Sequence, residues 1–231
     1  MDAIIFARYW EPGKIKTRLC PALLPEEAAR VHRACLDLLV ARLGLVAELS
    51  VVIAYEPDEK RDAFAKRYAK VELVPQRGAD LTEKLIHVAR AYDEPCIITG
   101  SDCATVPLDY HRQAAAALRG GADVVLGPTE DGGSYILGLQ PGRAEWFSDI
   151  PWSSGREGQE LEQRAWRRGW KLERLSTWYD VDRPRDLRRL AMDARAGMDR
   201  KEVDARFADD LRLLDELSRC AREPGPVKPE P

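Results

Sequence analysis

The sequence has few cysteines, no long apolar run and no excess of charge of one sign, and each of these absences excludes a class of protein. The five cysteines are odd in number and form no Cys-x-x-Cys pair, so the sequence predicts neither a disulfide framework nor a zinc site. No apolar stretch approaches the roughly 18 residues that a membrane span needs. Lys and Arg number 36 against 39 Asp and Glu, so we expect no nucleic-acid partner and no membrane-surface binding.

The N-terminal segment MDAIIFARYW has no basic stretch before its apolar residues and does not resemble a secretory signal. Together with the unpaired cysteines, this predicts a reduced, cytoplasmic protein. A chain of 231 residues with 45% hydrophobic content can form one sizeable domain, which we expect over residues 1–195. An apolar helical stripe predicts a C-terminal helix over 196–222 that docks on this domain or on a second subunit in a homodimer, and the proline-rich residues 223–231 should be disordered.

Short apolar runs alternate with amphipathic segments along most of the chain. The expected strands are 3–7, 48–54, 71–74, 96–99, 122–126, 134–139 and 171–175. The expected helices between them are 25–44, 58–69, 81–92 and 108–121. This alternation predicts an α/β fold of three layers, α/β/α, around a mostly parallel sheet. No helix pattern follows 122–126, which favours an added antiparallel strand and a mixed sheet.

Ligands of open α/β sheets bind outside the carboxyl ends of the strands, so the loops that follow the predicted strands are the candidate site. The first such loop carries the basic residues Arg8, Lys14, Lys16 and Arg18 around a turn at Gly13. In an extended segment the last three cations would point the same way and suit a chain of phosphate oxygens. A solvated basic loop is the alternative.

Acidic residues follow two of the other predicted elements. Asp102, after Gly100 and Ser101, ends a buried strand, where a carboxylate can hold a hard divalent cation; capping of the next turn is the alternative. Asp180 and Asp182 would face the same side of an extended segment and could share a cation or bind a metal beside Asp102. For Asp182 the competing interpretation is a cap for the helix that Pro184 starts.

Five motifs in order make the chain resemble a known family, the small GT-A-like transferases known as radical-SAM-associated glycosyltransferases. They are PGKIKTRL at 12–19, GSDC at 100–103, GPTEDGGSYILGL at 127–139, IPW with Ser153 at 150–153, and DVDRPRDL at 180–187. The resemblance covers about residues 3–190. It extends more distantly to phospholactate and phosphoenolpyruvate guanylyltransferases, which share the nucleotide-diphospho-sugar transferase fold.

The resemblance implies roles for individual residues. Nucleotide and its phosphates would be bound by Arg8, Gly13, Lys14, Lys16, Arg18, Gly100 and Ser101. Asp102, Asp180 and Asp182 would hold Mg²⁺ or Mn²⁺, and Asp102 and Asp131 would be catalytic. The other substrate-binding positions would be Gly132, Gly133, Ser134, Trp152, Ser153 and Lys84.

The chain departs from the family pattern at several of these positions. Ala104 stands where the family tends to have proline, Ser134 replaces an aromatic residue, and Ser154 replaces threonine. DLTEK at 80–84 leaves Lys84 where the family has an arginine, and a lysine cannot reproduce the planar bidentate fork of a guanidinium.

The Asp131-Gly132-Gly133 turn has two interpretations. Asp-Gly is a strong hairpin signal, which would make the turn purely structural. The resemblance favours a second interpretation, in which the two glycines let the backbone approach a ligand closely. Asp131 would then reach a sugar hydroxyl, a metal-bound water or the nucleophile of an acceptor.

These features predict a metal-dependent transferase that moves a glycosyl group from a nucleotide-sugar donor to a small acceptor. Sugar-activating nucleotidyltransferases carry a glycine-rich loop after the first strand, whereas this chain has the single Gly13 there, which favours glycosyl transfer. Two alternatives stay open: nucleotidyl transfer to a phosphorylated small acid, and an inactive nucleotide-binding module, which the departures at Lys84 and Ser134 would suit.

Overall fold

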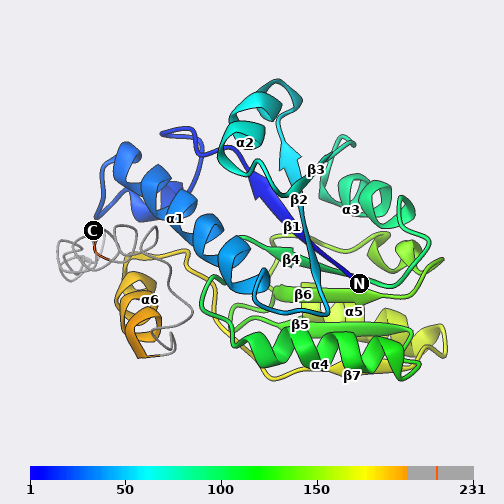
Figure 1. Ribbon diagram of the computed structural model, residues 1–231. Coiled ribbons are helices and arrows are strands. Elements are labelled where there is room, and N and C mark those ends of the chain that lie inside the picture. Colours follow the sequence, from blue (N-terminus) through cyan, green and yellow to red (C-terminus); the bar gives the residue numbers. More distant parts are fainter. Residues whose placement is uncertain (197–211, 213–231) are drawn as a thin grey trace, which may run out of the picture.

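A seven-stranded mixed sheet forms the centre of the computed structural model, which describes residues 1–196 and Arg212 (Figure 1). The strand order is β3-β2-β1-β4-β6-β5-β7. The strands are β1 Asp2–Arg8, β2 Ser50–Glu56, β3 Glu72–Pro75, β4 Cys96–Gly100, β5 Val124–Pro128, β6 Ser134–Leu139 and β7 Leu172–Arg174. Every pairing is parallel except those of β6, which runs antiparallel to β4 and to β5. The predicted mixed sheet with one inserted antiparallel strand is therefore confirmed.

Helices cover both faces of the sheet, as the predicted three-layer fold requires. They are α1 Pro25–Leu43, α2 Arg61–Arg67, α3 Leu81–Arg90, α4 Leu108–Arg119, α5 Glu157–Arg167 and α6 Pro184–Ala196, with short 3-10 turns at Thr17–Leu19, Asp58–Lys60 and Ala144–Phe147. The first core layer packs α1, α2 and α4 on one face of the sheet, and the second packs α3 and α5 on the other. A third cluster joins α1, α6 and the turn at Thr17–Leu19.

Strand alternation creates the two core layers. Ile4 and Ile5 of β1 are both fully buried but belong to different layers, because successive side chains of a strand point to opposite faces. Because both faces of these strands are buried, β1 and β4 have unbroken apolar sequences instead of alternating apolar and polar residues.

The sequence patterns did not predict the helix α5. Its segment is strongly charged, and only Leu161 and Ala165 bring fully buried apolar side chains to the core, too few for a clear periodic pattern. The predicted C-terminal helix and tail lie outside the described residues, apart from Ala196 in α6 and Arg212. In the described part of the chain, no helix has the length and apolar character needed to cross a membrane.

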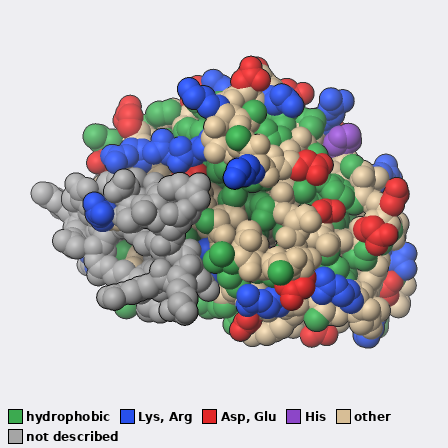
Figure 2. All heavy atoms as spheres, viewed as in Figure 1, with side chains coloured by type: hydrophobic (Ala, Val, Ile, Leu, Met, Phe, Trp, Pro, Cys, Tyr) green, Lys and Arg blue, Asp and Glu red, His purple; other side chains and the backbone are tan. Residues whose placement is uncertain are grey.

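Charged side chains of both signs are interspersed over the face of the molecule shown in Figure 2. This distribution agrees with the nearly balanced count of acidic and basic residues. An anion-binding site on this protein therefore has to be a local arrangement of a few cations.

Candidate active site

A cleft of about 560 Å³ opens at the edge of the sheet where β1, β4 and β5 end. Because β6 is antiparallel, it begins at this same edge, and the turn between β5 and β6 is carried into the cleft. Ten predicted site residues line the cleft: Arg18, Gly100, Asp102, Asp131, Gly133, Ser134, Trp152, Ser153, Asp180 and Asp182. The segments that supply them are far apart in the sequence, and the topology of the sheet brings them together.

Lys16 lies between two acids at the floor of this region. Its Nζ is 2.9 Å from Asp102 Oδ2 and 3.2 Å from Asp182 Oδ1, and it also donates a hydrogen bond to the carbonyl oxygen of Val181. The Lys16 side chain is only 3% exposed. These three oxygens match the three N–H donors of the ammonium, so in this arrangement Lys16 has no donor left for a phosphate.

The electrostatics keep Lys16 and Asp102 ionised at neutral pH. Burial alone would lower the pKa of Lys16, but its attraction to Asp102 and Asp182 outweighs burial and raises that pKa well above its usual range. Burial alone would raise the pKa of Asp102, but Lys16 and the neighbouring His32 hold it well below its usual range. In this arrangement the floor of the site therefore holds a charged ion pair.

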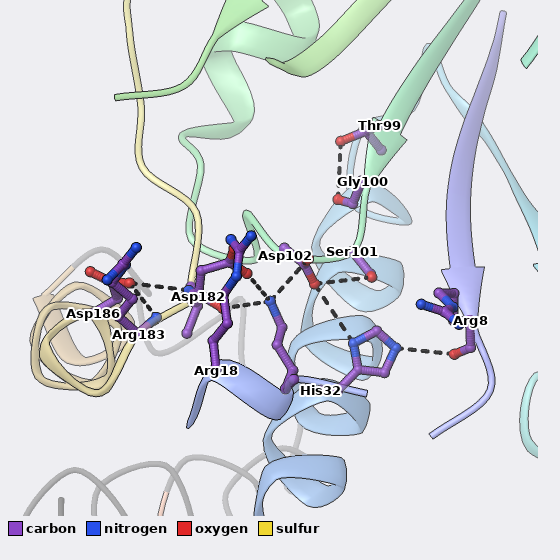
Figure 3. Close-up of polar contacts among 12 residues, drawn as sticks. Arg8, Arg18, His32, Thr99, Gly100, Ser101, Asp102, Asp182, Arg183 and Asp186 are labelled. Carbon is purple, nitrogen blue, oxygen red and sulfur yellow. Dashed lines mark hydrogen bonds and ion pairs between the residues drawn. The ribbon is translucent and has the colours of Figure 1, made fainter. Parts of the chain in front are cut away.

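Three further contacts orient the acids (Figure 3). Arg18 Nη1 lies 2.7 Å from Asp182 Oδ2 at the exposed side of the cluster. On the buried side, His32 of α1 places Nδ1 3.6 Å from Asp102 Oδ1, and its Nε2 lies 3.0 Å from the carbonyl oxygen of Arg8. Ser101 also donates to Asp102 Oδ1, at 3.4 Å. His32 was not predicted to be a site residue. Its only signal in the sequence is that it is titratable and lies on the apolar face of a long helix.

The basic loop differs from the extended segment that was predicted. Gly13 and Lys16 both have left-handed backbones, with φ of 77° and 50°, and a 3-10 turn follows at Thr17–Leu19. Lys14 consequently points away from Lys16 and pairs with Glu11 at 3.0 Å, with 70% of its side chain exposed. The expectation that Lys14, Lys16 and Arg18 point the same way was wrong, because it assumed a period of two residues in a segment that turns.

Two other predicted cations lie outside the cleft lining. Arg8 Nε is 3.1 Å from Glu56 Oε1, and Lys84 of α3 forms an ion pair with the other oxygen of the same carboxylate. Both cations therefore share Glu56, at the end of β2. Their predicted contacts with substrate stay predictions.

The Asp-Gly-Gly turn is the hairpin turn of its first interpretation and also lies at the cleft, while its predicted contact with a ligand stays a prediction. It closes the antiparallel β5–β6 hairpin, with Asp131 Oδ1 accepting the N–H of Gly133 at 3.1 Å, and it also lines the cleft. Gly132 has φ of 92°, and a Cβ built on it would lie 2.0 Å from the carbonyl oxygen of Gly155. The close approach that requires this glycine is thus to the 150–155 segment of the same chain.

Asp180 and Asp131 form the less neutralised part of the acidic lining. Burial, together with the negative charges of Asp131 and Asp182, raises the pKa of Asp180 to about 6. Within the part of the chain that the structure describes, neither Asp131 nor Asp180 forms an ion pair with Lys or Arg. Also among these residues, no three His, Cys, Asp or Glu side chains are arranged to hold a metal ion as they stand. Oxygen donors of the kind that Mg²⁺ prefers are nevertheless gathered at one place.

The remaining lining residues were not predicted to form the site, although several stand within the family motifs, because each also has an ordinary structural explanation. They are Phe6, Leu81, Leu85, Ile98, Thr99, Cys103, Thr129, Tyr135, Leu137, Ser154, Gly155, Glu157 and Arg183. Most of the apolar ones belong to the second core layer, and no pattern in the sequence separates a core leucine from one that also borders a cleft.

Comparisons with known proteins agree with this fold. Residues 39–154, half of the chain, match a family described as "Uncharacterized protein conserved in bacteria (DUF2064)". A solved structure from Desulfovibrio desulfuricans G20, a provisionally assigned nucleotide-diphospho-sugar transferase, is 26% identical with a TM-score of 0.81, covering 94% of this chain and 96% of that one. No curated protein matches the chain.

More distant structures share the architecture at lower identity. CMP:2-keto-3-deoxy-manno-octonic acid synthetase, solved with CTP, has a TM-score of 0.57 at 15% identity and covers 84% of this chain and 98% of that one. A cytidylyltransferase from Leptospira borgpetersenii serovar Hardjo-bovis has a TM-score of 0.56 at 14% identity and covers 98% of each chain. The predicted nucleotide-diphospho-sugar transferase fold is confirmed, and these neighbours are enzymes by name. The finer resemblance to radical-SAM-associated and guanylyltransferase families stays a prediction.

Proposed function

The chain belongs to the DUF2064 family, and from its fold and its cleft we propose that it is a transferase whose donor is a nucleotide-sugar and whose acceptor is a small molecule. The observation that carries the proposal is the acidic cluster at the end of the sheet. Four aspartates from three separate segments line one cleft, and two of them already share the ammonium of Lys16. An arrangement of this kind is costly to maintain unless a cation completes it, either alone or together with the phosphates of a ligand.

Arg18 is the residue best placed to meet the donor's phosphates. It lines the cleft, and its side chain is 62% exposed even though one nitrogen contacts Asp182. A guanidinium has five N–H donors, so several stay available for phosphate oxygens while that contact is kept. Lys16 can join only by giving up one of its three oxygen partners, and leaving Asp102 or Asp182 would free that carboxylate as the diphosphate arrives.

The cation that the resemblance implies, Mg²⁺ or Mn²⁺, fits the donor chemistry of this cluster. Of the four aspartates, Asp180 and Asp131 have no ion-pair partner in the described chain. Burial and then the repulsion from Asp131 and Asp182 raise the pKa of Asp180, and a bound cation would relieve that repulsion. Asp102 and Asp182 would also become ligands of the cation once Lys16 has moved from them to a phosphate oxygen. When bound, the cation would neutralise charge that develops on the leaving diphosphate.

Asp131 is the proposed proton acceptor for the incoming hydroxyl. Its carboxylate is exposed at the tip of the hairpin, and its orientation is held by the N–H of Gly133 and the hydroxyl of Thr129. One carboxylate oxygen stays free of these contacts and can take a proton from an acceptor bound in the cleft.

Nucleotidyl transfer is the second candidate. Four aspartates in one cleft could hold two cations, an arrangement that suits the transfer of a nucleotidyl group to a phosphorylated acceptor. Incubation with Mg²⁺ and small acceptors distinguishes the two reactions by their products. Release of a nucleoside diphosphate from nucleotide-sugars supports the proposal. Pyrophosphate from nucleoside triphosphates, with the sugar donors inert, would replace it by the second candidate, and binding without turnover of either donor would indicate an inactive module.

A further inference from the structure

One end of the cleft is apolar, in contrast to the acidic end that contains the proposed chemistry. The apolar end is lined by Phe6, Leu81, Leu85, Ile98, Leu137 and Trp152. Ile98 of β4 is paired with Leu137 of β6, and Phe6 stands two residues beyond Ile4, the β1 partner of Ile98, so three neighbouring strands present these side chains on one face. The apolar end is thus an open edge of the second core layer.

Two of these residues remain available to a ligand. Leu81, the first residue of α3, is 41% exposed, and it is one of few large apolar side chains that reach solvent in the described chain. Trp152 is half-buried, and its indole N–H donates to Thr82 Oγ1 at 2.8 Å, which ties the ring to the start of α3. A fixed aromatic ring beside an exposed leucine offers apolar area with little ordering cost on binding.

We propose that the acceptor carries an alkyl or aryl group, which lies against Leu81 and Trp152 while its reacting hydroxyl lies beside Asp131 at the acidic end. This inference rests on the proposed function, since it assigns the apolar end to the second substrate of the transferase. It adds the substrate's chemical class: an amphiphilic small molecule with a polar reacting end.

The alternative occupant is the nucleobase of the donor, and the lining disfavours it. Among the six side chains of the apolar end, the only N–H or O–H donor is the indole of Trp152, which is already bound to Thr82. A nucleobase placed there would lose water from its polar edge without gaining partners from these side chains, at a cost of about 1–3 kcal/mol for each unpaired group. An alkyl or aryl group has no such edge.

A matched pair of neutral probes tests the inference without requiring turnover. n-Hexyl β-glucoside and methyl β-glucoside have the same polar part and differ only in apolar length. Titration calorimetry with the full chain should show the hexyl compound binding at least about tenfold more tightly, because each buried CH₂ contributes about 0.8 kcal/mol. Leu81→Asn should reduce this preference about threefold or more. Leu45→Asn, at an exposed leucine outside the cleft, is the control and should leave the preference unchanged.

Each outcome separates this inference from the proposed function. Equal affinity for the two glucosides, or a preference that Leu81→Asn does not change, overturns the inference even if transfer activity is found. Hexyl glucoside and a nucleoside diphosphate could instead exclude each other, with Leu81→Asn weakening the binding of the diphosphate. That result would assign the apolar end to the nucleobase and would also overturn the inference. A Leu81-dependent preference without any transfer would support an apolar-ligand site and reject the transferase.

Discussion

Lys16 and Asp182 are 166 positions apart in the sequence, yet Lys16 Nζ lies 3.2 Å from Asp182 Oδ1. The contact joins the loop after the first strand to the segment before α6, and the same ammonium also contacts Asp102. Since the Lys16 side chain is almost completely buried, its loss would leave two carboxylates close together without the cation that they share.

Lys16→Met should destabilise the protein by about 3 kcal/mol, the lower end of the cost of breaking a buried ion pair, because the two carboxylates left uncompensated are partly exposed. Urea unfolding at pH 7 measures the change. Lys14→Met removes a lysine of the same loop whose ammonium pairs with Glu11 at the surface, and should cost less than about 0.5 kcal/mol. Similar costs for the two variants would contradict the central role of Lys16.

Asp102→Asn should abolish Mg²⁺-dependent nucleotide binding while the chain still folds, because the amide keeps the shape of the carboxylate but loses its charge. Binding of nucleoside diphosphates with and without Mg²⁺ is the measurement. Asp109→Asn changes an exposed acid at the start of α4 and serves as the control. Undiminished metal-dependent binding in Asp102→Asn would reject the assignment of this acid.

Arg18→Ala should weaken binding of a nucleoside diphosphate by about 1.5–3 kcal/mol and leave binding of the bare nucleoside almost unchanged, since a charge-assisted contact is lost only where phosphate is present. Arg112→Ala, at an arginine paired with Asp109 on α4, controls for the loss of a surface cation. A parallel loss for nucleoside and diphosphate would mean that Arg18 supports the loop through Asp182 without touching phosphate.

Gly132→Ala should destabilise the protein more than Gly142→Ala, although both glycines have positive φ, 92° and 76°. A Cβ at Gly142 meets no heavy atom within 4 Å, so that variant reports the backbone cost alone, about 1–2 kcal/mol. A Cβ at Gly132 would also lie 2.0 Å from the Gly155 carbonyl oxygen, and overpacking adds about 1–3 kcal/mol. Equal midpoints in thermal unfolding would show that the hairpin and the 150–155 segment are not tightly packed.

Asp180→Asn should stabilise the protein at pH 7 and have little effect at pH 3. The folded-state pKa of Asp180 is about 6, above its ordinary value of 3.8, so the folded state prefers the protonated form. The stability that this preference contributes is complete below about pH 4 and is lost as the pH rises through 6. Unfolding curves of the two proteins between pH 3 and pH 8 should therefore diverge with rising pH, and parallel curves would contradict the raised pKa.

Most of the secondary structure could be predicted because it depends on local patterns. The run AIIFA marks β1, and ADVVL marks β5 although the strand itself spans Val124–Pro128. The end of alternation after residue 127 correctly indicated that β6 is antiparallel. The helix α5 was missed because its few buried residues are embedded in a strongly charged segment.

The polar residues of the candidate site were found for a similar reason. Acids that directly follow strands can be recognised in the sequence. Because ligands bind at the carboxyl edge of a parallel sheet, the sequence alone predicts that Asp102 lies at the site. Asp131 was indicated by its Asp-Gly-Gly context and the family resemblance. All of these lie in the cleft.

Which polar groups pair with one another was decided by the tertiary structure alone. The sequence by itself determined the α/β architecture, the mixed sheet and the carboxylates at its edge, since these follow from the periodicity of residues close together in the chain. It did not determine that Lys16 turns inward to Asp102 and Asp182 while Lys14 turns outward to Glu11, nor that Gly132 is required by Gly155. The apolar end of the cleft was equally hidden, because it depends on where the second core layer stays open. Ion pairing and cavity shape arise between segments that only the folded chain brings together, so no local pattern encodes them.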